Sequence, residues 1–308
     1  MVKAVDRARE IGADALQIFS DNPTAWRRRA EPPRELAAFR EHLTVHDIAP
    51  VAIHAAYLVN LAGPDPESHE RSIDILATEL RGAPSFGARF INVHIGSHRG
   101  DGVQAGTRRL ADGVARALAR GAEPAAASPE GGASPEVIVV LENSAGGGFG
   151  LGVDIDELAG LAEAMAARGV AEDRVGFCLD TAHAWGAGID MGSPDAIDAF
   201  VASFDARIGL RRLVMVHLND SRSERGSRLD RHEHLGAGRI GALGLGHLLR
   251  HPALRHAVHI LETPGMDEGY DAVNVVRAHA LAAGAALDDL PVEAFQLRGS
   301  ARARTAPA

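Results

Sequence analysis

Seven short apolar runs recur along most of the chain, and within them apolar residues follow one another instead of alternating with polar ones. The runs span residues 13–19, 51–54, 88–94, 136–143, 174–180, 212–220 and 257–263. A strand that is apolar on both faces is covered on both sides, which is typical of parallel sheets. Amphipathic segments rich in Ala, Leu, Arg and Glu lie between the runs. This strand-then-helix order predicts an α/β fold, a barrel of the TIM (β/α)8 type.

The first strand of such a barrel has no counterpart in the sequence, because residues 2–13 have their apolar positions at helical spacing. Only seven strands can be counted. Either an upstream strand precedes Met1, or the barrel is open between its last strand and the run at 13–19. We expect the natural coding sequence to begin upstream, and the extended chain to be more stable and less prone to aggregation. An open doubly wound sheet is the alternative fold, but the glycines at 146–150 form no GxGxxG turn.

The composition predicts one enzyme domain. A chain of 308 residues that is 46% hydrophobic can bury a single large core, which we place at residues 1–284. Residues 121–136 read as a flexible insertion and residues 285–308 as a disordered tail. The single cysteine, Cys178, excludes an intramolecular disulfide and reads as a core residue. We expect a cytoplasmic monomer that has no contact with membranes, since neither a spanning segment nor a signal peptide is present.

Polar side chains of the types that bind metals stand at or just beyond the C-terminal ends of six of these runs. They are His54, His94, Glu142, Asp180, His183, His217, Asp230, His232 and Glu262. The C-terminal ends of barrel strands share one rim, so the sequence predicts a multi-metal active site there. Imidazole and carboxylate ligands without cysteine suit zinc in open catalytic sites, or manganese and iron. Three ions with about three protein ligands each, one carboxylate being shared, account for the whole set.

The net charge of −9 argues against a protein that coats nucleic acid in general, although it does not exclude a specific DNA-binding enzyme. Two groups of arginines lie in loops close to the candidate ligands. They are Arg27, Arg28 and Arg29, and Arg222, Arg225, Arg228, Arg231 and Arg239. These arginines are either a substrate-binding surface or simply a solvated loop face.

The residues around these positions resemble a known family. In order along the chain, the motifs are GADALQIFSDNPTAW, IHAAYLVNLAGPD, VHIGSH, LENSAGGG, CLDTAHAWGAGID, HLNDS, GSRLDRHEHLGAGRIG and ILETPG. Together they resemble the endonuclease IV family of apurinic/apyrimidinic-site DNA endonucleases over about residues 4–280. The resemblance implies a zinc-dependent deoxyribonuclease of base excision repair with a TIM barrel and three zinc ions. It implies hydrolysis of the phosphodiester 5′ to abasic sites in double-stranded DNA, leaving a 3′-hydroxyl.

The resemblance also implies a role for each candidate ligand. His54 and His94 would bind the first zinc, and Glu142, the catalytic residue, would bridge it to the second. Asp180, His217 and Glu262 would complete the second zinc site, while His183, Asp230 and His232 would hold the third. Manganese is an alternative ion at one of these sites.

The implied substrate contacts match the family only in part. Tyr57 and Leu58 correspond to residues that enter the minor groove near the abasic nucleotide, and Arg27 and Arg231 are further candidate contacts. Thr24 stands where the family often has an inserting arginine, which weakens the expected wedge, and residues 27–29 would compensate only in part. Ile95 replaces a usual proline, which we interpret as a backbone detail.

Two hypotheses compete with the endonuclease. A sugar isomerase or epimerase with the same kind of barrel would hold a single manganese with Glu142, Asp180, His217 and Glu262, which leaves the other candidate ligands without a role. A barrel that lacks its first strand could also be a relic that binds metal or damaged DNA but turns over poorly.

Overall fold

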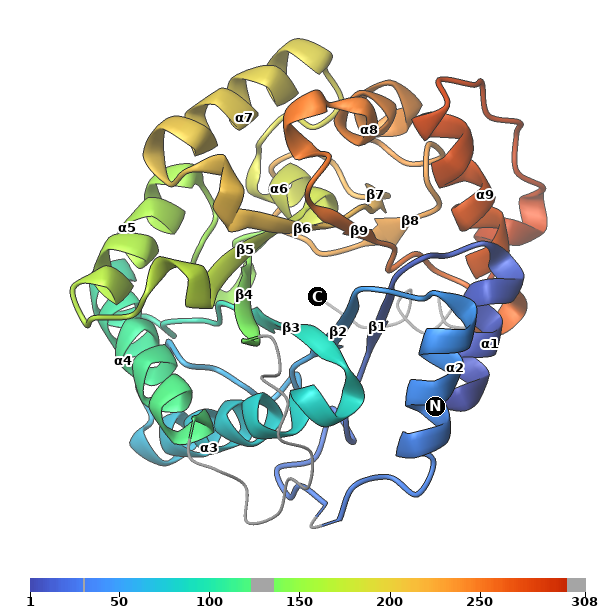
Figure 1. Ribbon diagram of the computed structural model, residues 1–308. Helices are drawn as coiled ribbons and strands as arrows, with labels where there is room; N and C mark the ends of the chain where they lie inside the picture. The colour runs from blue at the N-terminus through green and yellow to red at the C-terminus, as the bar shows by residue number, and fades with distance from the viewer. Residues whose placement is uncertain (30, 123–135, 298–308) are drawn as a thin grey trace.

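The computed structural model describes residues 1–29, 31–122 and 136–297. Seven parallel strands form one sheet in the order β1-β2-β3-β4-β5-β6-β9, which curves around a central axis with the helices outside it (Figure 1). The strands are β1 (Leu16–Ile18), β2 (Val51–His54), β3 (Ala88–His94), β4 (Ile138–Glu142), β5 (Val175–Asp180), β6 (Leu213–His217) and β9 (Val258–Ile260). The predicted TIM barrel is confirmed, and each strand lies within one of the predicted apolar runs.

The helices follow the strands in the order expected for a barrel. They are α1 (Val2–Ile11), α2 (Leu36–His46), α3 (Pro66–Gly82), α4 (Val103–Gly121), α5 (Ile155–Ala166), α6 (Thr181–Ala187), α7 (Pro194–Arg207), α8 (Gly241–Arg250) and α9 (Tyr270–Ala282). Local sequence sets where several of them begin. Asp65 caps α3 by accepting the Ser68 backbone N–H at 2.8 Å, and Asp154 caps α5 in the same way through Glu157.

The barrel interior is filled by a small apolar layer directly below the candidate ligands. Its buried members are Ala52, Phe90, Val140, Cys178, Met215 and Ile260. Five of these six stand two residues before a candidate ligand on the same strand or at its end. Because side chains two apart on a strand point to the same face, the apolar layer and the candidate ligands both face the barrel axis. Cys178 is therefore part of the floor of the site, and burial raises the pKa of its thiol to about 12.

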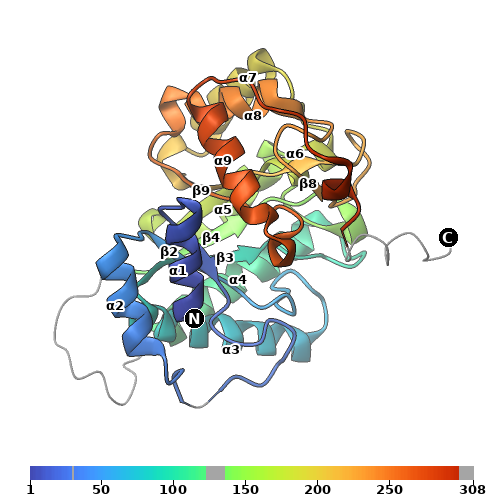
Figure 2. The same ribbon diagram turned by 90° about the vertical axis from the view of Figure 1, so that its right-hand side faces the viewer.

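The barrel is open along one seam, because β1 and β9 are the two edges of the sheet and do not pair with each other. Side chains bridge the seam instead. Gln17 of β1 donates a hydrogen bond to Glu262 at 2.9 Å, and Arg7 of α1 pairs with Asp271 of α9 at 2.7 Å. Helices α1 and α9 lie side by side across it (Figure 2). The structure thus has the seven strands that the sequence predicts, with the opening where the eighth was missing.

The C-terminal boundary predicted at residue 284 lies too early. A short 3-10 helix at Val292–Phe295 follows it, and Ala294 and Leu297 are buried. His234 is within hydrogen-bonding distance of the Ala294 carbonyl, at 2.9 Å. These few apolar residues lack a periodic pattern, so only the tertiary contact reveals them. Residues 298–308, and 123–135 of the predicted flexible insertion, lie outside the described residues.

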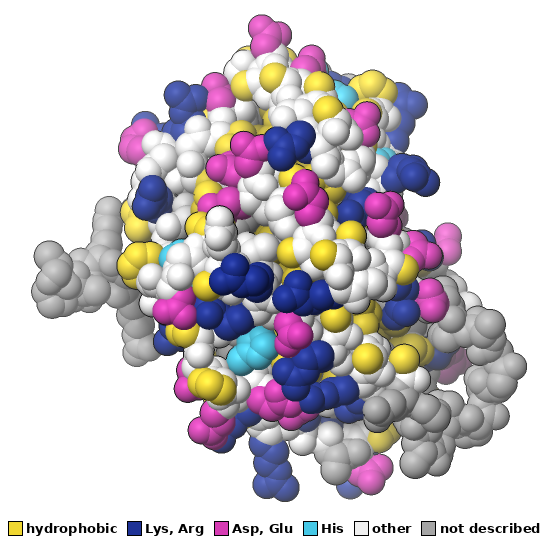
Figure 3. Space-filling view, turned by 90° about the vertical axis from the view of Figure 1, so that its left-hand side faces the viewer, with side chains coloured by type: hydrophobic (Ala, Val, Ile, Leu, Met, Phe, Trp, Pro, Cys, Tyr) yellow, Lys and Arg dark blue, Asp and Glu magenta, His cyan; other side chains and the backbone are white. Residues whose placement is uncertain are grey.

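The outer surface has the mixed charge of a solvated barrel. Basic and acidic side chains are interspersed over the face that α4 and α5 form (Figure 3). Glu70 of α3 pairs with both Arg116 and Arg120 of α4 at 2.6 Å. None of the helices in the described part of the chain is long and apolar enough to cross a membrane.

Candidate metal centre

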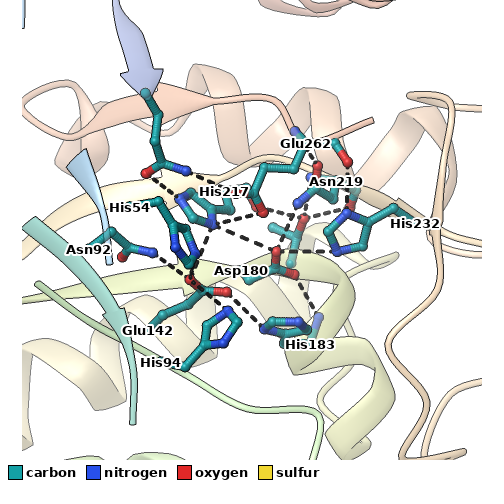
Figure 4. A network of polar contacts seen from close by, with 12 residues as sticks. His54, Asn92, His94, Glu142, Asp180, His183, His217, Asn219, His232 and Glu262 are labelled. Atoms are coloured by element: carbon teal, nitrogen blue, oxygen red, sulfur yellow. Dashed lines mark hydrogen bonds and ion pairs between the residues drawn. The ribbon is translucent and has the colours of Figure 1, made fainter. Parts of the chain in front are cut away.

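Strand register brings the candidate ligands together at one end of the barrel. His94 at the end of β3 is the register partner of Glu142 at the end of β4, and Asp180 of β5 is the partner of His217 of β6. His54 ends β2, and Glu262 follows β9 by two residues. The side chains of these strand ends converge on the barrel axis (Figure 4).

Three groups of ligand atoms fit around a metal ion each, with all atoms of a group within 4.8 Å of one another. The groups are His54, His94 and Glu142; Glu142, Asp180, His217 and Glu262; and Asp180, His183 and His232. Glu142 belongs to the first and second groups, and Asp180 to the second and third. The arrangement is therefore a chain of three adjoining sites that share two buried carboxylates.

Several buried polar atoms at the centre lie close to ionisable neighbours but make no well-aligned hydrogen bond within the described residues. They are Glu142 Oε1, His217 Nδ1 and His232 Nε2. A buried polar group without a partner costs about 1–3 kcal/mol, so such a concentration in one place needs an explanation. Carboxylate and imidazole atoms facing one another in this way fit a cluster of divalent cations.

Amide side chains orient the candidate ligands. Asn92 donates to Glu142 Oε2 at 2.5 Å, and Asn219 donates to Asp180 Oδ2 at 2.7 Å. Asn143 accepts the Asp180 backbone N–H at 2.6 Å, while Gln17 lies between Glu262 and His217 at 2.9 and 3.2 Å. Partners of this kind fix the direction of a ligand's lone pairs. Sequence reasoning missed them, although each asparagine stands within two residues of a predicted ligand.

The ionisable side chains at the centre shift one another's pKa values strongly. Burial on its own would raise the pKa of the Glu142 carboxyl, but His217 and His94 beside it hold that pKa well below its usual range. Burial likewise opposes a charge on His183, yet Asp180 and Asp230 raise the pKa of that imidazole well above its usual value. The buried carboxylates and imidazoles thus stabilise one another's charges, a role that bound cations would take over.

The third group lies at the edge of the rim, where a loop after β6 supplies two of the predicted ligands. Asp230 lies 3.3 Å from His183 Nε2 and 3.1 Å from His232 Nε2, although its own side chain is 58% exposed. The short strands β7 (Asp220–Ser221) and β8 (His232–Glu233) pair antiparallel within this loop. Buried Asp220 accepts hydrogen bonds from the backbone N–H groups of Gly238, Ile240 and Gly241. These bonds fix the end of the loop, where the chain enters α8.

Two of the predicted substrate residues, Tyr57 and Leu58, lie beside this centre. Tyr57 is 56% exposed, and its ring is 5.4 Å from that of His54 and 6.1 Å from that of His94. Leu58 is half-buried, whereas Arg27 and Arg231 are exposed. The nearby arginines differ from the prediction. Arg28 turns inward to Glu79 and Arg29 pairs with Asp21, which leaves exposed Arg27 as the remaining candidate of the three to compensate in part for Thr24.

A groove of about 660 Å³ opens onto the metal centre. Tyr57, Leu58 and the glycine-rich turn after β4 are among the residues that line it. Arg99 and Arg228 also line the groove, and both have a positive φ, at 49° and 58°. Such backbone strain in residues other than glycine is concentrated at functional sites. The groove thus offers cationic and aromatic side chains next to the candidate ligands.

Two further groups of metal-binding side chains lie on the outer helices, away from the strand ends. They are Asp6, His42 and His46 on α1 and α2, and Asp198, His247 and His251 at α7 and α8. Each is held by ion pairs, His42 to Asp6 at 2.8 Å and His247 to Asp198 at 2.6 Å. They share no residue with the centre.

The sequence is similar to known proteins over most of its length. The sequence model of the xylose isomerase-like TIM barrel family matches residues 5–286. The probable endonuclease 4 of Methanoculleus marisnigri is 39% identical over 280 residues, which cover 91% of this chain and 94% of the relative. The probable endonuclease 4 of Chloroflexus aggregans is 37% identical, with coverage of 91% and 93%.

Solved structures agree with the sequence comparison. The crystal structure of endonuclease IV from Thermus thermophilus has a TM-score of 0.75 and 36% identity, and covers 92% of this chain and 94% of that one. A D-tagatose 3-epimerase-like protein, at 14% identity and a TM-score of 0.62, shares the fold alone. The chain belongs to the endonuclease IV family of xylose isomerase-like TIM barrels, which confirms the resemblance found in its motifs, and it is a nuclease.

Proposed function

We propose that the chain is a DNA-repair endonuclease that hydrolyses the phosphodiester 5′ to abasic sites in double-stranded DNA and leaves a 3′-hydroxyl. The observation that carries this proposal is the chain of three adjoining donor groups linked by Glu142 and Asp180. Phosphodiester hydrolysis needs charge stabilisation on both the attacking and the departing oxygen, and adjoining cation sites provide it. A single-ion isomerase needs only the second of these groups.

Zinc is the ion that this centre fits best, with manganese as an alternative at one site. His54, His94 and Glu142 would hold the first ion; Glu142, Asp180, His217 and Glu262 the second; and His183, Asp230 and His232 the third, with Asp180 beside them. When bound, such ions supply Lewis-acid chemistry that activates water and neutralises phosphate charge. Glu142 is the proposed catalytic residue because it joins the first and second sites.

The remaining residues of the site bind and orient DNA. Arg99 and Arg228 line the groove, where their guanidinium groups would pair with backbone phosphates. Tyr57 and Leu58 face the same groove, and an exposed aromatic ring with an apolar neighbour is suited to hold an unstacked helix open at a missing base. Arg27 and Arg231 are exposed and would add contacts at the edges of the footprint. We place this activity in a cytoplasmic monomer.

Cleavage of a duplex that carries one tetrahydrofuran abasic analogue tests the proposal. We expect a single cut on the 5′ side, a product whose 3′ end a DNA polymerase extends, and no cut in the same duplex with an intact base. Glu142→Gln should abolish incision and leave the far-ultraviolet circular dichroism spectrum unchanged. Cleavage on the 3′ side, no cleavage at all, or a loss of only a few-fold in Glu142→Gln would contradict the proposal.

A further inference from the structure

The loop between β1 and α2 carries three consecutive arginines, and the middle one points away from solvent. Arg28 donates a hydrogen bond to Glu79 Oε1 on α3 at 2.8 Å, and the two side chains are 11% and 3% exposed. Its other terminal nitrogen donates to the Asn22 carbonyl within the same loop at 2.9 Å. Arg28 therefore ties the turn at Asn22 to a buried carboxylate beneath it.

The same turn contacts the segment that carries Tyr57. The Tyr57 backbone N–H donates to the Pro23 carbonyl at 3.0 Å, and the Phe19 ring lies 5.2 Å from the Tyr57 ring. Trp26, from the same loop, has the Arg71 guanidinium of α3 over its ring at 5.8 Å. The position of Tyr57 above the metal centre thus depends on a loop that is docked onto α3.

The Arg28–Glu79 pair is poorly arranged as a source of stability. Arg28 Nε and Glu79 Oε2 are buried and make no hydrogen bond within the described residues. Burial raises the pKa of Glu79 to about 7, against the opposing effects of Arg28 and the Ala56 backbone N–H. A buried ion pair with unsatisfied atoms contributes little net stability, because the cost of desolvation offsets the attraction between the charges. A role in fixing geometry explains better why these two charges are buried.

We propose that the Arg28–Glu79 ion pair is a positioning device that holds the loop at residues 19–29 against α3, and thereby fixes Tyr57 at the groove. Its effect on substrate rests on the proposed endonuclease function. Arg28 and Glu79 are positioning residues, since neither lines the groove nor contacts a candidate ligand. The pair acts on binding of the duplex and not on the chemical step.

The double variant Arg28→Met/Glu79→Met tests this without leaving an unpaired buried charge. We expect KM for the abasic duplex to rise about tenfold, with kcat within about twofold and metal content unchanged. Quenching of tryptophan fluorescence by acrylamide should increase, because Trp26 leaves its place beside Arg71 while Trp185 lies elsewhere. The single variant Glu79→Gln keeps the shape of the side chain and a hydrogen bond to Arg28. Its KM should therefore lie between that of the wild type and that of the double variant.

The matched control is the ion pair between Arg7 and Asp271, which joins α1 to α9 and includes no residue of the loop. Arg7→Met/Asp271→Asn should lower the melting temperature and leave KM and quenching as in the wild type. Unchanged KM and quenching in the Arg28/Glu79 variant, or equal changes in the control, would overturn the proposal. If the wild type does not incise the duplex, the proposed function fails, and quenching alone then decides whether the pair holds the loop.

Discussion

Asn219 joins two candidate ligands at the centre, so its removal should weaken both the fold and metal binding. The residue is fully buried; its amide donates to Asp180 Oδ2 at 2.7 Å, and its carbonyl oxygen accepts the Glu262 backbone N–H at 2.9 Å. A hydrogen bond to a charged group contributes about 1.5–3 kcal/mol, and an orphaned buried N–H costs about 1–3 kcal/mol. Asn219→Ala should therefore lower the free energy of unfolding by about 3–5 kcal/mol.

The chain offers a matched control in Asn274, which is equally buried but bonds only groups outside the candidate ligands. Its side chain accepts the Leu235 backbone N–H at 3.0 Å and donates to the Tyr270 carbonyl at 2.8 Å. Both variants should lose stability in urea denaturation. Only Asn219→Ala should lose zinc to a chelator, with an affinity lower by about 10–100-fold, because Asp180 is no longer oriented. Equal zinc retention in the two variants would show that Asn219 does not orient a metal ligand.

Three further predictions follow from the site and its surroundings. Tyr57→Ala should weaken binding to an abasic duplex by about 1–3 kcal/mol in fluorescence anisotropy, with metal content unchanged; undiminished binding would make Tyr57 a rim-packing residue. Asp230→Ala should remove one zinc per chain and most of the incision rate, and normal activity would take the third ion out of the mechanism. Because the pKa of Glu79 is raised from 4.5 to about 7 on folding, its contribution to stability is present below pH 4.5 and is lost as the pH rises through 7. Denaturation midpoints of the wild type should then fall relative to Glu79→Gln over that interval, and parallel pH profiles would contradict this.

The fold and the candidate ligands could be predicted from sequence because both depend on local pattern. A run such as residues 136–143 is apolar enough to be a covered parallel strand, and it ends in Glu142 at the rim where such strands meet. The ligands from the ends of six strands needed only that rule and the shared direction of the strands.

Other features required tertiary contacts that no local pattern contains. The sequence alone does not distinguish Arg27, Arg28 and Arg29 from one another. Only the position of α3 in the structure reveals that Arg28 pairs with buried Glu79. Gln17 occupies the middle of a short strand, and only the curvature of the sheet brings it across the open seam between Glu262 and His217. Leu297 is buried although the segment around it has no apolar period.

The number of zinc ions per purified chain, measured by elemental analysis alongside incision of the abasic duplex, tests the central claim most directly. Two double variants, His42→Asn/His46→Asn and His247→Asn/His251→Asn, serve as controls for metal binding by the two groups on the outer helices. We expect about three ions per chain in the wild type and in both variants, because the three donor groups at the strand ends hold them. A ratio near one, with no incision, would contradict the account and favour the single-ion isomerase.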